Sequence, residues 1–175
     1  ASRKVNRGRR AYGQRKHVHM PSSPPTPPPS SSSKKILVPV DGSENSRRAL
    51  EQAISIAKGS AAGASVTIAH VIERPPTIYV ESQKLLDELL AKYRQESEKV
   101  LGEFEAHAEK LGLKVESAVI MEGDAATNIV SYADKGKFDI IVMGSRGLDR
   151  FREVVLGSVS SKVLQHAKCP VLIVK

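Results

Sequence analysis

The chain has 175 residues with a net charge of +8 at pH 7; 40% of them are hydrophobic and 26% are charged, the balance of an ordinary single-domain globular protein. A single cysteine, Cys169, excludes an internal disulfide framework and a cysteine-built zinc site. No apolar run approaches the roughly 20 residues of a membrane helix, and 4% aromatic residues supply few stacking platforms for single-stranded nucleic acid.

The positive charge is concentrated at the start of the chain. Nine of the 27 basic residues and none of the 19 acidic ones lie in residues 1–35, so the remainder carries a net charge of −1. Residues 21–33 hold six prolines, six serines and a threonine, a composition that cannot build a core. We therefore predict a disordered, basic, Pro/Ser-rich tail at 1–34 and one folded domain at 35–175.

Three interpretations of the tail stay open. It is a basic arm for nucleic acid or acidic lipid, an organelle transit peptide, or an upstream or vector-encoded leader joined at Met20. We expect a cytoplasmic protein, or an organellar one if the tail is a transit peptide. The nearly neutral remainder argues against nucleic acid as a ligand of the folded domain, and no membrane insertion is expected.

From Lys35 onward, short apolar runs alternate with helical patterns. The run KILVPV predicts a buried strand, and Asp41-Gly42-Ser43 predicts a turn after which Ser43 or Asn45 caps a helix. Strands are expected at residues 35–40, 66–72, 114–121, 139–143 and 171–174. Helices are expected after Ser43 as far as Gly59, at 81–111, after Asp124 to near Gly136, and at 158–165.

Strands that alternate with helices indicate an α/β fold with a mainly parallel sheet. We expect a single doubly wound sheet of five strands in the order 3-2-1-4-5, with helices on both faces. Such sheets bind ligands beyond the carboxyl ends of their strands, where the strand order reverses. This rule directs attention to Asp41, Val71, Ile72, Gly123 and Gly144.

A glycine-rich motif follows the fourth expected strand. The sequence reads Gly144-Ser145-Arg146-Gly147, then nine residues, then Gly157-Ser158. Glycines let backbone amides approach an anion closely, and the start of the last helix, with Ser158 and Ser160, favours phosphate. Each piece alone is commonly a βα turn or a helix cap. The combination is far less common and predicts a phosphate site.

Residues 35–175 resemble the universal stress protein family along their whole length. The matching segments are, in order, ILVPVDGS, AHVIE, GDAATNIV, DIIVMGSRG, GSVSSKVL and CPVLIVK. The family's ATP-binding signature, G-x-x-G, nine residues and then G-Ser/Thr, is met in full. The family has nucleotide-binding and non-binding branches, and the intact signature implies the binding branch.

The resemblance also implies roles for particular residues. Asp41 would contact the ribose, Val71 would present its backbone to the adenine edge, and Ser158 would stand nearest a Mg²⁺ or Mn²⁺ ion bound with the nucleotide. The implied ligand is ATP, or AMP or ADP. The expected contact residues are Pro39, Val40, Asp41, Val71, Met143, Gly144, Ser145, Gly147, Gly157, Ser158, Val159 and Ser160. Arg146 occupies a position that varies in the family, and Gly123 and Asp124 are expected to edge the pocket without binding.

The implied function is that of an ATP-binding regulatory domain, a nucleotide-dependent switch in the stress response with little or no hydrolysis and no catalytic residue. Two alternatives stay open: a slow ATPase or nucleotidyl-transfer enzyme of the same fold, and a structural dimer that binds no nucleotide. Asp149 and Glu153 are the acidic residues of the motif loop. The chain has no G-x-x-x-x-G-K-[ST], no G-x-G-x-x-G after its first strand and no G-x-S-x-G, which excludes Walker-type ATPases and argues against dinucleotide oxidoreductases and α/β-hydrolases.

Family resemblance further implies a homodimer formed through the C-terminal strand at 171–174. A bare apolar edge strand invites pairing, and a two-fold copy would cover it. His70, His107 and His166 lack metal or triad spacing, and we expect them to be structural or surface residues.

Overall fold

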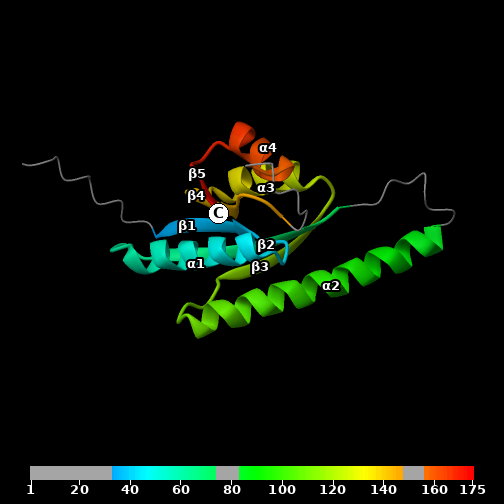
Figure 1. Cartoon of the computed structure of the whole chain (residues 1–175), viewed down its shortest axis with the longest axis horizontal. Helices are drawn as coiled ribbons and strands as arrows, with labels where there is room; N and C mark the ends of the chain where they lie inside the picture. The colour runs from blue at the N-terminus through cyan, green and yellow to red at the C-terminus, as the bar shows by residue number, and fades with distance from the viewer. Residues whose placement is uncertain (1–32, 74–82, 148–155) are drawn as a thin grey trace, which may run out of the picture.

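The computed structural model describes residues 33–73, 83–147 and 156–175, and within them five parallel strands form one sheet in the order β3-β2-β1-β4-β5 (Figure 1). The fold and the strand order predicted from the sequence are thus confirmed. The predicted tail at 1–34 lies almost wholly outside the described residues. In chain order the elements are β1 (Lys34–Pro39), α1 (Glu44–Gly59), β2 (Ala64–Ile72), α2 (Gln83–Lys110), β3 (Ser117–Glu122), α3 (Ala125–Gly136), β4 (Ile140–Gly144), α4 (Ser158–His166) and β5 (Val171–Val174).

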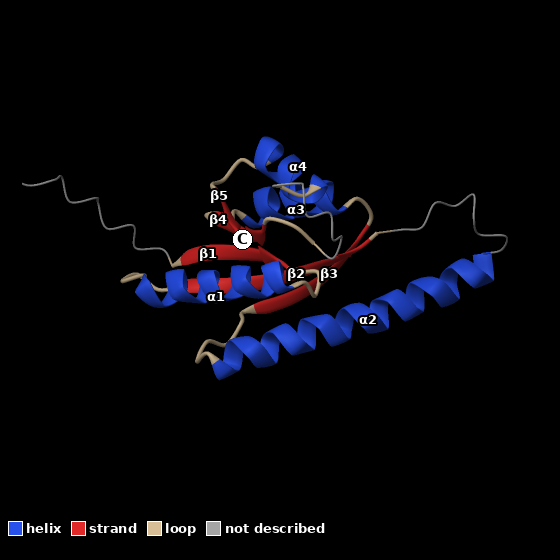
Figure 2. Ribbon diagram, viewed as in Figure 1, coloured by secondary structure: helices blue, strands red, loops and turns tan. Residues whose placement is uncertain are grey.

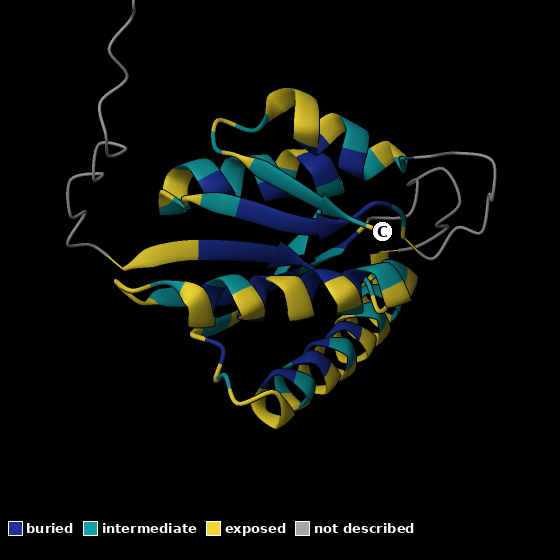
Figure 3. Ribbon diagram, turned by 60° about the vertical axis from the view of Figure 1, so that its left-hand side comes forward, coloured by how far each residue is buried: buried dark blue, intermediate teal, exposed yellow. Residues whose placement is uncertain are grey.

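Helices cover both faces of the sheet. α1 and α2 pack on one face, and α3 and α4 pack on the other (Figure 2). The central strands lie between these layers, as the dark blue segments of Figure 3 show, and Ile36, Leu37 and Val38 of β1 are fully buried. Burial on both faces is the reason why these strands read as continuous apolar runs.

The strands separate at their carboxyl ends, which makes room for a site. The ladder between β1 and β2 ends at Pro39–Ala69, and β1 pairs with β4 only at Ile36–Ile140 and Leu37–Ile141. β2 nevertheless continues beside β3 as far as Ile72–Glu122. After β1 the chain crosses to α1 on one face, and after β4 it crosses to α4 on the other, so the strand order reverses at this crevice.

Local sequence signals start the helices that frame this edge. The hydroxyl of Ser43 accepts a hydrogen bond from the amide of Ser46, so Ser43, and not Asn45, caps α1. Asp124 caps α3 in the same way by accepting from the amide of Thr127. Gly42 precedes the first cap with a φ of +85°, a conformation that glycine adopts without strain.

α2 is longer than the sheet that it covers. Its buried residues are Ser97, Leu101, Phe104 and Ala108, all in its second half, and its first half projects past the strands (Figure 1). Packing with α1, β2 and β3 therefore buries mainly the C-terminal part of this helix. No helix in the described ranges combines the length and apolar character needed to cross a membrane.

The third strand begins later than the sequence predicted. It was expected from residue 114 and begins at Ser117, where its pairing with Thr67 starts. Val115 is buried, and the amide of Glu116 donates to the carbonyl of Val66. The apolar pattern therefore extends into the connection that precedes the strand, and the predicted start was wrong.

Candidate functional site

A cleft of about 490 Å³ opens at the carboxyl edge of the sheet. Its walls come from the ends of β1, β2 and β4, from α3 and from the first turn of α4. The volume lies within the range of roughly 300–1,000 Å³ that is common for small-molecule sites. The described lining residues are Pro39, Val40, Asp41, Ala69, Val71, Glu73, Ala125, Ile129, Met143, Gly144, Arg146, Gly147, Gly157, Ser158, Val159 and Ser160.

All but one of the predicted contact residues line this cleft, and Ser145 is the exception. Its amide donates to the carbonyl of Val174 at 2.7 Å, and its carbonyl accepts from the amide of Gly157 at 2.7 Å. The Ser145 hydroxyl is buried and has no hydrogen-bond partner among the described residues. Ser145 thus ties β4 to β5 and to the start of α4. Contact between the lining residues and a nucleotide remains a prediction.

One end of the cleft is suited to an anion. Gly157 is the N-cap residue of α4 and supplies no side-chain cap. The first amides of the helix, those of Ser158, Val159 and Ser160, have no intrahelical carbonyl to bond, and all three residues line the cleft. A helix start carries partial positive charge, and the side chain of Arg146 adds a cation to the described lining.

The two serines at the start of α4 are placed differently. Ser160 is buried, and its hydroxyl lies 2.9 Å from the carbonyl oxygen of Gly144 and 3.2 Å from that of Ser145, positioned to donate to either. This hydrogen bond therefore joins the first turn of α4 to the end of β4. Ser158 is exposed at the cleft, so its hydroxyl is the one suited to reach a ligand.

Asp41 and Gly147 meet across the cleft. One carboxylate oxygen of Asp41 accepts a hydrogen bond from the amide of Ser43 at 3.0 Å. The other lies so close to Gly147 that a Cβ at that position would collide with it. The amide nitrogen of the Asn45 side chain also donates to the carbonyl of Arg146 at 3.3 Å. These contacts join the loop after β1 to the loop after β4.

Gly144 is required by packing at the end of β4. A Cβ added there would lie 2.9 Å from the backbone carbonyl carbon of Asn45 and 3.1 Å from the amide nitrogen of Ser46. Such distances force backbone to move, so the glycine lets β4 approach the first turn of α1. Any side chain at 144 would disturb the fold together with the cleft.

The other end of the cleft is apolar. Ala69 and Val71 of β2 face it from one side, and Ala125 and Ile129 of α3 also line it. Glu73, immediately beyond β2, completes this end. The sequence prediction missed these residues apart from Val71. Strand alternation carried the needed signal for Ala69 and Glu73, because residues two apart in a strand share a face.

Residues expected to be structural have structural surroundings. The Nδ1 of His70 lies 2.8 Å from the carbonyl oxygen of Val40, to which it donates, and His107 lies 2.9 Å from Glu51. Burial raises the pKa of the half-buried Cys169 thiol, which disfavours its reactive thiolate. The described residues contain no group of three or more His, Cys, Asp and Glu side chains arranged to hold a metal ion.

Comparisons with known proteins point to the same family as the sequence motifs. The family model described as the universal stress protein family matches residues 32–175. Universal stress protein MJ0531 of Methanocaldococcus jannaschii is 37% identical over 144 residues, which are 81% of each chain. The solved structure of MJ0577, a universal stress protein from the same organism, is 32% identical with a TM-score of 0.69 and matches 81% of this chain and 95% of its own. A universal stress protein crystallised in complex with cAMP is 29% identical with a TM-score of 0.57, over 81% of this chain and 96% of its own.

Proposed function

The chain belongs to the universal stress protein family, and from that premise we propose that it binds an adenine nucleotide in the cleft and acts as a regulatory domain of the stress response. The observation that carries the proposal is the polarity of the cleft. Uncapped helix amides and Arg146 lie at one end, and the apolar side chains of β2 and α3 lie at the other. A phosphate-bearing nucleoside has the same polarity.

The residues present fit such a ligand. Gly157 has no side chain, and a Cβ there would come within 3.4 Å of the Arg146 Cα and the Ser145 carbonyl oxygen, so the glycine lets the loop after β4 pack closely against the start of α4, whose first residues line the cleft. Asp41 supplies carboxylate oxygens that can accept from ribose hydroxyls. The family member that holds cAMP supports adenine as the base.

We propose that Ser158 lies beside the metal ion when a triphosphate binds with Mg²⁺ or Mn²⁺. An ion at this place would draw most of its ligands from phosphate oxygens and water, because the described residues provide no cluster of carboxylates and histidines there. Its contribution would be to neutralise phosphate charge. The ion is thus expected to matter for ATP and much less for AMP.

Regulation, and not turnover, is the role that we propose. Hydrolysis requires a group that orients or activates water near the terminal phosphate. In the described lining the carboxylates are Asp41, held by the Ser43 amide, and Glu73 at the apolar end away from the phosphate. Asp149 and Glu153 lie outside the described residues. Phosphate release from ATP no faster than that of a binding-deficient variant is the expected result; release well above that background would establish the slow ATPase instead.

A homodimer through β5 is the assembly that we propose. β5 is an edge strand of the sheet, and all four of its residues are half-buried. The carbonyls of Pro170, which precedes β5, and of Val174 accept from the amides of Ile141 and Ser145, so by the alternation of a parallel ladder Val171 and Ile173 direct their backbone groups outward. A second copy of β5 would cover this row.

Titration calorimetry of the purified chain with AMP, ATP and cAMP tests the binding proposal. Saturable binding of at least one of them at micromolar to low millimolar concentration is expected. Mass spectrometry of any small molecule released from the purified protein provides a second measurement. If none of the three bound at millimolar concentration and nothing co-purified, the protein would be a structural dimer with a non-binding cleft.

A further inference from the structure

Glu73 is a carboxylate at the apolar end of the cleft that the proposed nucleotide contacts do not use. It follows Ile72, the last residue of β2, and strand alternation brings it to the same face as Ala69 and Val71. The remaining polar side chains of the described lining lie elsewhere. Arg146, Ser158 and Ser160 belong to the opposite end, and Asp41 is held against Gly147.

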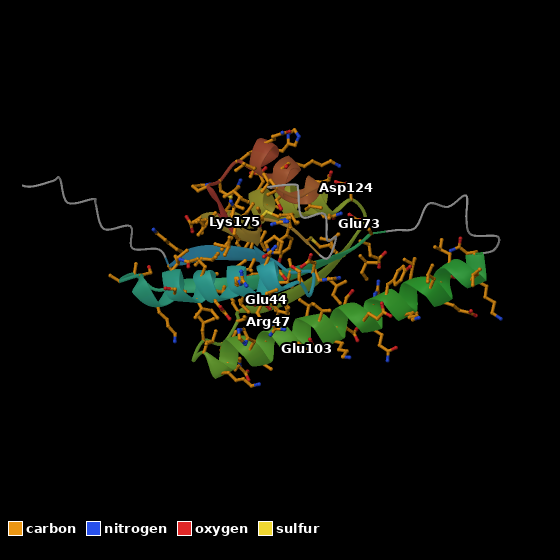
Figure 4. All side chains as sticks on the ribbon, viewed as in Figure 1. Glu44, Arg47, Glu73, Glu103, Asp124 and Lys175 are labelled. Carbon is orange, nitrogen blue, oxygen red and sulfur yellow. The ribbon has the colours of Figure 1, made fainter. Side chains whose placement is uncertain are left out.

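The Glu73 carboxylate is exposed and has no hydrogen-bond or ion-pair partner in the described part of the chain. Its acidic neighbour differs in this respect. Glu73 and Asp124 lie at the same end of the sheet, where β2 and β3 finish (Figure 4). Asp124 accepts from the amide and the hydroxyl of Thr127 and lies 3.7 Å from the ammonium of Lys162. Of these two carboxylates, Glu73 is therefore the one that is available to a ligand.

Resting on the function proposed above, we propose that Glu73 reads the exocyclic amino group of the base and so selects adenine over 6-oxopurines. In the pose that we propose, a purine lies between Val71 and the α3 residues Ala125 and Ile129, with its phosphate at the start of α4. Its 6-amino edge then faces the Glu73 carboxylate as well as the Val71 backbone; all of these residues line the cleft. An ionised carboxylate only accepts hydrogen bonds. The 6-amino group of adenine donates, whereas the 6-oxo group of inosine and guanine in the same pose places an oxygen against the carboxylate.

The expected size of this base selectivity depends on the solvent exposure of the Glu73 side chain. A buried group left unpaired would penalise the wrong base by several orders of magnitude, because it could not recover its lost hydrogen bonds. Glu73 is exposed, so water can solvate it when the ligand lacks an amino group. A preference of about tenfold is therefore expected, the scale of one hydrogen bond to a charged group at a wet site.

Calorimetric titrations with AMP, purine riboside 5′-monophosphate and IMP test this proposal, since the second ligand differs from AMP only by lacking the 6-amino group. The wild-type chain is expected to bind AMP about tenfold more tightly than purine riboside 5′-monophosphate, and IMP more weakly still. In Glu73→Ala the preference for AMP should fall to the part that the Val71 backbone provides, whereas Glu73→Gln, which keeps an acceptor oxygen, should retain more of it. Glu116→Ala removes an exposed carboxylate beside the amino end of β3, far from the carboxyl edge, and should leave the preference intact.

Thermal melts of the variants monitor folding, and Glu73 is exposed, so no loss of fold is expected. Equal binding of the two monophosphates to the wild type, or an undiminished preference in Glu73→Ala, would overturn the role of Glu73 while leaving nucleotide binding established. Absence of binding by every ligand would instead overturn the proposed function, and the base selectivity with it.

Discussion

The carboxylate of Asp41 fills the space into which a side chain at Gly147 would project. Asp41 follows β1, and Gly147 closes the first half of the glycine motif after β4, so two loops about a hundred residues apart are fitted to each other. The Ser43 amide holds one oxygen of the carboxylate and limits how far it can turn away. A glycine at the exposed position 147 therefore leaves the Asp41 carboxylate in its place.

Gly147→Ala is expected to weaken AMP binding about tenfold and to leave folding nearly unchanged. The new Cβ displaces the Asp41 carboxylate from the cleft. The methyl group meets no other atom of the described residues within 4 Å and the residue is exposed, so the fold should tolerate it. Calorimetry measures the affinity, and a thermal melt measures stability. Unchanged affinity for AMP would show that Asp41 has no part in binding. Gly144→Ala is unsuitable for this purpose, because it forces backbone apart.

Gly102→Ala is the matched control and carries a prediction of its own. Gly102 is exposed in the interior of α2, and a Cβ there meets nothing within 4 Å. Alanine in a helix interior is favoured over glycine by about 1 kcal/mol, so denaturant unfolding should show a gain of roughly 0.5–1 kcal/mol. AMP affinity should not change. A loss of stability would mean that this surface of α2 is covered in the folded protein.

Ser158 and Ser160 should separate ligand binding from folding. Ser160→Ala removes the hydroxyl that donates within the β4–α4 junction and leaves buried carbonyl groups short of a donor, at a cost of about 1–2 kcal/mol of unfolding free energy. Ser158→Ala should keep stability and weaken ATP in the presence of Mg²⁺ more than AMP. Urea unfolding and calorimetry together check both. Equal effects of the two changes on stability would contradict the assignment.

Asp124 should contribute to the loss of stability as pH falls below about 4. Hydrogen bonds from the hydroxyl and the amide of Thr127, and then Lys162, lower the pKa of Asp124 from its ordinary value of 3.8. The folded state therefore favours the ionised form, and its contribution is present above that value and is lost as pH falls through the lowered pKa. Asp124→Asn keeps a capping oxygen without the charge.

The melting temperature of Asp124→Asn should thus be lower than that of the wild type at pH 7, and the difference should shrink as pH falls below about 4. Glu103→Gln removes an exposed carboxylate from α2 and serves as the charge-matched control. A difference that stays constant from pH 7 to pH 2 would show that the charge of Asp124 does not contribute.

The assembly prediction concerns the outward amide of Ile173. Ile173→Pro removes that donor and spares the carbonyls of Pro170 and Val174 that accept from β4. Sedimentation is expected to show a dimer for the wild type at tens of micromolar, a monomer for the proline variant, and a dimer for the control Ile173→Val. A dimer that survives the proline would place the interface on another surface.

The sequence predicted the structure best where a local feature, such as a buried strand or a helix start, depends on one type of residue. The run KILVPV predicted a strand, which is buried from Ile36 onward, and the glycine motif marked the start of α4 at Ser158. Prediction was weaker where tertiary pairing decides, as at Ser117, where β3 begins because its pairing with β2 starts there, opposite Thr67. The cleft shows the same division. Gly157 and Ser158 were predicted from their spacing, whereas the side chain of Ser145 is turned inward by pairing with β5, and Glu73 lines the cleft through strand alternation that the motif did not include.

The hydrogen bond from the Ser145 amide to the Val174 carbonyl makes a single proton a reporter for two events. This amide can exchange with deuterium only when β5 lifts from β4. The carbonyl of the same residue accepts a hydrogen bond from the amide of Gly157. A ligand bound at the start of α4 would therefore also stabilise the backbone around Ser145. The exchange rate of this amide can be followed by nuclear magnetic resonance. Slower exchange on addition of AMP would report occupancy of the cleft, and slower exchange at higher protein concentration would report closure of the sheet edge.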